Sequence, residues 1–163
     1  MTLEYIINEF ADLEPRERLE LLLEYSEGLP PLPSEYEAQR LAGEHRVHEC
    51  QTPVFLWVNV HQETTGVETP DSASKDSPPA QAQVEIHAWV APEAPTVKGF
   101  VAILREAFHG QAVETVLAAP LDLLQRLGLA QALGMMRTRG LSAILHYIRR
   151  QVERGGSIDG SYT

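Results

Sequence analysis

The first thirty residues carry apolar positions at helical spacing, interrupted mainly by glutamate. They predict two helices, one over the first ten residues and one over residues 13–30, where Pro15 occupies an early helical position. The apolar positions expected to face a core are Leu3, Ile6, Ile7, Phe10, Leu19, Leu22 and Leu23. The sequence GLPPLP ends the second helix, because proline cannot continue a helix and restricts the residue before it. We expect residues 34–43 to add one or two helical turns.

From residue 53 the apolar pattern changes to a period of two, which is typical of a strand with one buried face. Residues 54–60 and 83–90 both follow this pattern. The two strands should pair antiparallel, with their aliphatic side chains on a common core face. The other face is expected to be polar and solvated. It would hold Trp57, His61, His87 and Trp89. The sequence EHRVHE, residues 44–49, predicts a short edge strand, giving a sheet of about three strands.

Residues 62–81 separate the two strands and have almost no large apolar side chains. The segment is rich in proline, serine, threonine and aspartate. Such a segment cannot bury enough surface to offset the entropy lost on ordering. We therefore predict a long mobile hairpin loop here.

The remainder of the chain has helical patterns. Thr96 is predicted to cap a helix, residues 110–133 are expected to form two short helices broken near Pro120, and a last helix is predicted from about 138 to 153. The two long helices would bury Val97, Phe100, Val101, Leu104, Phe108, Leu141, Ile144, Leu145, Ile148 and Val152. Residues 155–163 are predicted to be a flexible tail. Helices, a small antiparallel sheet and further helices predict a single α+β domain over residues 1–154.

The length and charge of the chain narrow its function. A chain of 163 residues is large enough to bury about two thirds of its unfolded surface in one domain. A net charge of −10 argues against nucleic-acid binding, which depends on lysine and arginine neutralising phosphates. No secretory signal and no apolar run of about 20 residues is present, so we expect a cytoplasmic protein without a membrane segment.

The chain has one cysteine, Cys50, in the stretch VHECQTPVFLWV. A single cysteine excludes an internal disulfide and any site built from several thiolates of one chain. Free cysteine is usually buried and inert. Cys50 lies, however, between a polar stretch and a strand, just before Pro53, and a nucleophilic thiol needs access and cationic neighbours. The residues alone leave the structural and the reactive interpretation open.

The histidines raise the question of a metal site. His45 and His48 lie close to Cys50 in sequence, and the two strand histidines could approach each other on the sheet. A zinc site needs three or four converging ligands, so we expect no bound metal. We predict that His109 and His146, which flank helical stripes, lie on the surface. The sequence has no G-x-S-x-G nucleophile motif and no glycine-rich phosphate loop.

Three segments together resemble the SufE family, sulfur acceptors that work with cysteine desulfurases in iron–sulfur cluster assembly. ECQTPVFLWV is similar to the family's cysteine segment and APTVKGFVAIL to its Val-Lys-Gly helix start. LAQALGMMRTRGLSAILHYIR resembles the C-terminal Leu-x-x-x-Arg-x-x-Gly-Leu segment. The resemblance covers nearly the whole chain and implies a SufE/IscU-like fold. The chief departure is the 62–81 segment, which is longer than the family's short hairpin.

The resemblance implies that Cys50 accepts a persulfide sulfur from a SufS-like cysteine desulfurase and stimulates that enzyme. It further implies that Arg137 lies near the thiol. Arg139, two residues on and of the same charge, is the alternative cation. Gln51 would brace the loop. Pyridoxal phosphate would belong to the desulfurase, and a downstream iron–sulfur scaffold would receive the sulfur. This chain, as a monomer or homodimer without its own cofactor, would then be a carrier and activator rather than a stand-alone enzyme. The alternative is a non-catalytic regulatory or scaffold-type module that docks a desulfurase.

Lys98 and Gly99 match the family's helix start, and we assign them structural roles. Glycine inside a helix costs about 1 kcal/mol relative to alanine. Gly99 therefore predicts that another element packs closely against this helix.

Overall fold

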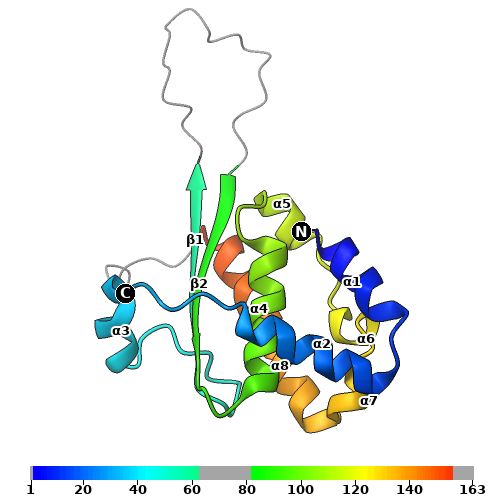
Figure 1. Cartoon of the computed structure of the whole chain (residues 1–163). Helices are drawn as coiled ribbons and strands as arrows, with labels where there is room; N and C mark the ends of the chain where they lie inside the picture. The colour runs from blue at the N-terminus through cyan, green and yellow to red at the C-terminus, as the bar shows by residue number, and fades with distance from the viewer. Residues whose placement is uncertain (1, 63–81, 156–163) are drawn as a thin grey trace, which may run out of the picture.

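The computed structural model describes residues 2–62 and 82–155, and it confirms the predicted α+β class (Figure 1). The helices are α1 (Leu3–Ala11), α2 (Pro15–Glu27), α3 (Glu37–Leu41), α4 (Pro95–Phe108), α5 (Val113–Leu117), α6 (Leu123–Arg126), α7 (Ala130–Leu133) and α8 (Met135–Glu153), with a 3-10 turn, η1 (Ser34–Tyr36), before α3. The strands are β1 (Val54–Gln62) and β2 (Ala82–Val90). Apart from Gln62 and Gly155, the predicted hairpin loop and the predicted tail lie outside the described residues. Within these ranges, no helix combines the length and the apolar composition that crossing a membrane requires.

The two strands pair antiparallel, as predicted, from Val54 opposite Val90 to Gln62 opposite Ala82. Their aliphatic side chains share one face, against which α8 packs mainly on β1 and α4 mainly on β2. The buried residues of this face are Val54, Leu56, Val58, Val84, Ile86, Ala88 and Val90. Figure 1 shows the sheet between these helices on one side and α3 on the other.

The prediction of a solvated second sheet face is wrong. Trp57 is only 1% exposed, and its indole Nε1 donates a hydrogen bond of 2.6 Å to Gln39 Oε1. The ring of Tyr36 contacts the rings of both Trp57 and His87, each with a centroid distance of 5.2 Å. The guanidinium of Arg40 lies over the ring of Trp89, 4.4 Å from its centroid. Residues of η1 and α3 thus cover this face, because its aromatic side chains offer a large area for burial.

The predicted third strand is reduced to a single bridge. In the described part of the chain the sheet has two strands, and Arg46 forms one isolated antiparallel bridge with Phe55. The pairing rests on hydrogen bonds from Val47 N–H to Val54 O (2.9 Å) and from Leu56 N–H to His45 O (3.0 Å). It ends at His45, whose φ of 63° is incompatible with a continued strand.

The outer edge of β2 is covered by the C-terminal end of α4 and the residues after it. Val84 exchanges backbone hydrogen bonds with Gln111 (2.8 Å) and Gly110 (2.7 Å). Ile86 N–H donates to His109 Nδ1 at 3.1 Å, and Arg105 Nε donates to Ile86 O at 3.0 Å. His109 is therefore half-buried rather than fully on the surface as predicted, and burial, with the charge of Arg105 second, lowers its pKa.

The helical boundaries differ from the prediction in detail. Helix α4 begins at Pro95, so Thr96 lies inside the first turn and does not cap it. Residues 113–133 form three short helices rather than two, and α8 begins at Met135, three residues before the predicted start. Gly134, with a φ of 81°, lies between α7 and α8 and allows the sharp change of direction. On α2, Leu22 is fully buried but Leu23 is 42% exposed, contrary to its predicted core position.

Helices α2 and α4 cross at Gly99, and this confirms the close approach predicted from the sequence. A Cβ atom at residue 99 would lie 2.3 Å from the carbonyl oxygen of Leu22, much closer than any normal contact. Because that atom belongs to the backbone of α2, a side chain at 99 would force the two helices apart.

We expect Gly99→Ala to lower the free energy of unfolding by about 1–3 kcal/mol, although alanine is the better helix former. Urea denaturation measures this change. Gly28→Ala is the matched control, because a Cβ there would meet only the carbonyl oxygen of Tyr25 at 3.4 Å. Equal stability of Gly99→Ala and the wild type would contradict the close crossing.

Candidate functional site

Cys50 lies in a short loop, residues 48–53, which we call the cysteine loop. The loop joins the bridge at Arg46 to β1, and the hydrogen bond between Val47 and Val54 closes its base. Inside it, Cys50 N–H donates to Val47 O at 3.2 Å, and at its end Pro53 O accepts a hydrogen bond of 3.1 Å from Ala91 N–H. The loop is therefore fixed at both ends by backbone hydrogen bonds.

The thiol of Cys50 is buried, with 4% of the residue exposed. It faces α8 at Gly140, where a Cβ atom would lie 3.6 Å from Cys50 Sγ. Burial raises the pKa of the thiol, while a hydrogen bond with the backbone of Thr52 and the charge of Arg46 oppose the shift. Because burial is the larger effect, the resting thiol is protonated at neutral pH.

A cleft of about 690 Å³ lies beside the thiol. Its walls come from three segments that are distant in sequence: the cysteine loop, the start of α4 and the start of α8. The lining residues are Glu49, Cys50, Gln51, Thr52, Pro53, Glu93, Ala94, Pro95, Thr96, Val97, Met136, Arg137, Arg139, Gly140 and Leu141. The structure thus brings Cys50, Gln51, Arg137 and Arg139 to one cleft, whereas Lys98 and Gly99 lie outside its lining.

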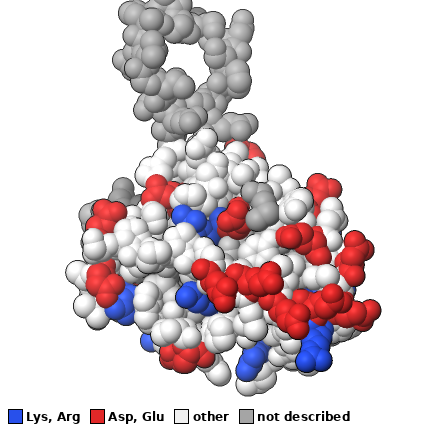
Figure 2. Space-filling model, viewed as in Figure 1, with Lys and Arg blue, Asp and Glu red and all other residues white. Residues whose placement is uncertain are grey.

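Two features contribute positive charge to the cleft, whose lining also contains the carboxylates of Glu49 and Glu93. Arg137 and Arg139 are exposed, and neither forms an ion pair within residues 2–62 and 82–155. Helices α4 and α8 both begin at the cleft without an acidic residue in the first turn and without a side-chain cap. The free N–H groups of a helix start carry a partial positive charge. On the face shown in Figure 2, by contrast, acidic side chains form a row over α2.

An ion pair connects the cysteine loop to α8. Arg150 Nη2 lies 3.1 Å from Glu49 Oε1, and both side chains are about half exposed. The charge of Arg150 contributes to the lowered pKa of Glu49, after a backbone hydrogen bond within Glu49 itself. Because Glu49 directly precedes Cys50, the ion pair holds the cysteine loop against the helix that covers the thiol.

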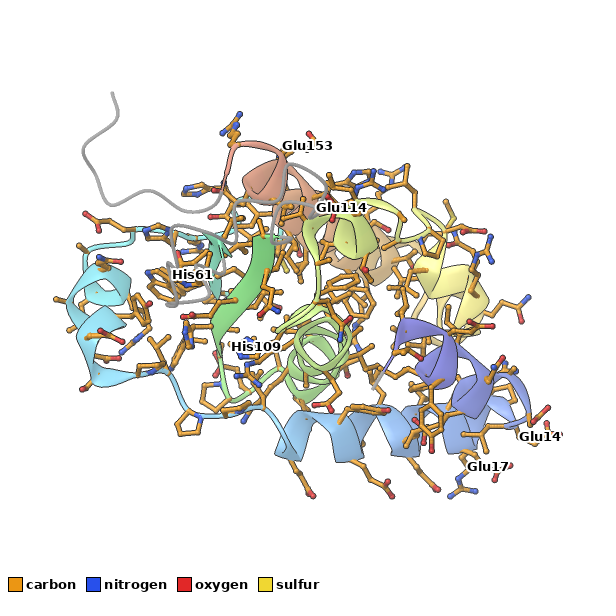
Figure 3. The ribbon with its side chains drawn as sticks, turned by 90° about the horizontal axis from the view of Figure 1, so that it is seen from above. Glu14, Glu17, His61, His109, Glu114 and Glu153 are labelled. Carbon is orange, nitrogen blue, oxygen red and sulfur yellow. The ribbon has the colours of Figure 1, made fainter. Side chains whose placement is uncertain are left out.

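The histidines are distributed over separate environments. His61 Nε2 lies 2.8 Å from Glu85 Oε2, and His87 pairs with the other oxygen of the same carboxylate. The ring of His45 packs against Trp57 rather than toward the thiol. Figure 3 shows His61 at the sheet and His109 near the end of α4. In the parts of the chain that the structure describes, no three histidine, cysteine or acidic side chains are placed to share a metal ion.

Four residues of the site were not identified from the sequence: Arg46, Glu49, Gly140 and Arg150. Gly140 is the glycine of the Leu-x-x-x-Arg-x-x-Gly-Leu segment, but that segment did not indicate that the glycine lies against the thiol. The other three are ordinary charged residues, and Glu49 and Arg150 are 101 positions apart. Arg46 and Glu49 are close to Cys50 in sequence, but only the fold shows that Arg46 acts on the thiol and that Arg150 pairs with Glu49.

Comparison with known proteins gives one consistent family. A model of the SufE family, described as an Fe-S metabolism associated domain, matches residues 4–152. The chain is 32% identical over 147 residues to an uncharacterized SufE-like protein of Mycobacterium tuberculosis, known from two strains, covering 90% of this chain and 88% of the relative. The fold is similar to the solution structure of a hypothetical protein from Thermus thermophilus, with a TM-score of 0.69 and 32% identity, over 95% of this chain and 98% of that one.

We expect Arg150→Gln to accelerate alkylation of Cys50 by up to about fivefold, because loss of an exposed ion pair has a small effect on loop opening. Glu49→Gln should give the same increase, and the double variant should add nothing further. The matched control is the ion pair of Arg126 with Asp122, at 2.8 Å and also about half exposed. If Arg126→Gln accelerates alkylation equally, the Glu49–Arg150 pair has no specific effect on the cysteine loop.

Proposed function

The chain belongs to the SufE family, whose domain is associated with iron–sulfur metabolism, and we propose that Cys50 is its sulfur acceptor. In this proposal Cys50 takes sulfur from the persulfide of a SufS-like cysteine desulfurase and carries it toward an iron–sulfur scaffold. The observation that carries the proposal is the position of the chain's one cysteine, in a short loop beside a cleft with two arginines. Pyridoxal phosphate would be held by the desulfurase, and this chain would contribute only the acceptor.

The transfer is a thiol–persulfide exchange. The thiolate of Cys50 attacks the outer sulfur of the partner's persulfide, a new S–S bond forms at Cys50, and the S–S bond within the partner breaks. The partner cysteine leaves as a thiolate, so the outer sulfur moves without any external oxidant or reductant. Cys50 loses its proton to solvent before the attack, and the thiolate is the form that reacts.

The buried thiol must move before it reacts. At rest Cys50 has almost no accessible surface, and burial raises its pKa. Movement of the cysteine loop toward the cleft would expose the sulfur and remove the cause of the raised pKa. Closure after transfer would place the persulfide away from reductants and oxidants. The fixed ends of the loop, at Val47 and Pro53, limit the movement to about six residues.

Arg137 and Arg139 would act on the sulfur anion when the loop has moved. A guanidinium stays charged at any working pH and stabilises a nearby thiolate or persulfide anion. Of the two, Arg137 is our candidate, because it matches the arginine of the family segment. Arg46 already acts on the thiol in the closed position.

One observation favours a second candidate function. A cysteine that is buried and protonated at rest also fits a regulator that docks a desulfurase without accepting sulfur. In that protein Cys50 would be a packing residue of the core. The two functions differ in whether sulfur becomes bound to Cys50.

We expect the wild type, mixed with a cysteine desulfurase and free cysteine, to gain one or more sulfur atoms on Cys50 by mass spectrometry. Cys50→Ser should gain none and keep its circular dichroism spectrum, since a hydroxyl is nearly isosteric with a thiol but forms no persulfide. Full stimulation of the desulfurase by Cys50→Ser would support the regulator. Loss of the fold in Cys50→Ser would identify Cys50 as a structural residue.

We expect Arg137→Ala to slow sulfur uptake and to raise the apparent pKa of Cys50 further, measured as the alkylation rate against pH. Because burial raises the pKa of this thiol, alkylation of the folded wild type should require a higher pH than alkylation of the unfolded chain. The same shift makes Cys50 stabilise the fold below the thiol pKa of the unfolded chain, a contribution lost as pH rises through the folded pKa. Arg139→Ala tests the competing arginine, and a larger effect of that variant would assign the role to Arg139. If the pKa of Cys50 and the rate of sulfur uptake are both unchanged in Arg137→Ala, Arg137 does not stabilise the sulfur anion.

A further inference from the structure

Gly140 lies where α8 passes the thiol of Cys50. A Cβ atom at this position would lie 3.6 Å from Cys50 Sγ and 4.0 Å from Cys50 Cα, which is ordinary van der Waals contact. The glycine backbone is in the normal helical range, so no unusual conformation requires glycine here. An alanine would therefore fit beside the unmodified thiol, and it would also favour the helix.

The contrast with Gly99 shows what is unusual about Gly140. At residue 99 a Cβ would meet a backbone oxygen at 2.3 Å, so the resting structure itself requires glycine. At residue 140 the resting structure does not require it. Gly140 and Cys50 both line the cleft.

We propose that Gly140 leaves the space in which the outer sulfur of a Cys50 persulfide lies when the cysteine loop is closed. This inference rests on the proposed function, and it assigns Gly140 as a positioning residue for the loaded state. The outer sulfur stands about 2.05 Å from Sγ. On the side of α8 it would come much closer to a Cβ at 140 than the usual contact distance of about 3.5–4.0 Å.

The proposal predicts different effects on the empty and the loaded protein. With alanine at 140 the empty loop still closes, because the contact to Sγ is ordinary. The loaded loop would be overpacked and would stay open more of the time. The persulfide would still form, since transfer takes place with the loop open, but it would be less protected from small thiols in solution.

The experiment compares wild type, Gly140→Ala and His146→Ala after loading by a cysteine desulfurase and free cysteine. His146 is exposed on the same helix, so its replacement by alanine is a control for increased helix propensity. We expect Gly140→Ala to lose its outer sulfur to dithiothreitol on the order of tenfold faster than the other two, as followed by mass spectrometry. Its unmodified thiol should react with iodoacetamide at the wild-type rate, and its Tm should not fall.

The possible results distinguish a failure of the proposed acceptor function from a failure of the role proposed for Gly140. If no form of the protein gains sulfur, the proposed function itself is wrong. If all forms gain sulfur and lose it at the same rate, the role of Gly140 is wrong and the acceptor function stands. If Gly140→Ala has a lower Tm and its empty thiol already reacts faster, the glycine is required by packing at rest, and that also overturns the proposal. Gly140→Ser, with a side chain at least as large, must reproduce the result of Gly140→Ala.

Discussion

A two-stranded antiparallel sheet is not stable in water on its own, and much of this chain is arranged to cover one. Helices α4 and α8 bury the aliphatic face, and Tyr36, Gln39 and Arg40 cover the aromatic face. Both edges are partly paired as well. Residues 45–47 bond to the free edge of β1, and residues 109–111 bond to the free edge of β2. The cysteine loop therefore connects two segments that are both held by backbone hydrogen bonds to the sheet.

The position of the cysteine follows from this enclosure. The segment that pairs with the edge of β1 must turn back to enter β1, and residues 48–53 make that connection. Cys50 lies in the middle of the connection, where α8 passes over it without a side chain at Gly140. Cys50 is thus carried by a short segment rather than by a helix or strand, and α8 covers its thiol. A short segment with fixed ends opens at lower free energy than the whole fold does.

Several features of the fold are predictable because they depend on local patterns. Period-two alternation gave both strands and their shared core face, and the cost of a helical glycine gave the close crossing at Gly99. The helical turns expected at residues 34–43 are present as η1 and α3, but their packing on the aromatic face was not predictable, because it depends on contacts between segments distant in sequence. The prediction of a third strand was wrong because the positive φ of His45, which ends the pairing, cannot be predicted from the sequence EHRVHE.

The residues of the site also include some that were predictable from the sequence and others that depend on long-range contacts. Cys50 was a candidate site residue because it lies between a polar stretch and a strand. The resemblance to the SufE family made Arg137 a second candidate. The partners that control the thiol depend on contacts across the chain. Arg150 reaches Glu49 from 101 residues away, and the burial that raises the thiol pKa is a property of the assembled fold. Sequence patterns identify residue types capable of chemistry, whereas packing determines their state at rest.

We propose that Cys50 becomes accessible by local movement of the cysteine loop and not by unfolding. The most direct measurement is the alkylation rate of Cys50 at urea concentrations below the unfolding transition. A local opening exposes little surface, so we expect a rate almost independent of urea. A rate that rises with urea as steeply as global unfolding does would rule out local opening, because the thiol would then be reached only in the unfolded chain.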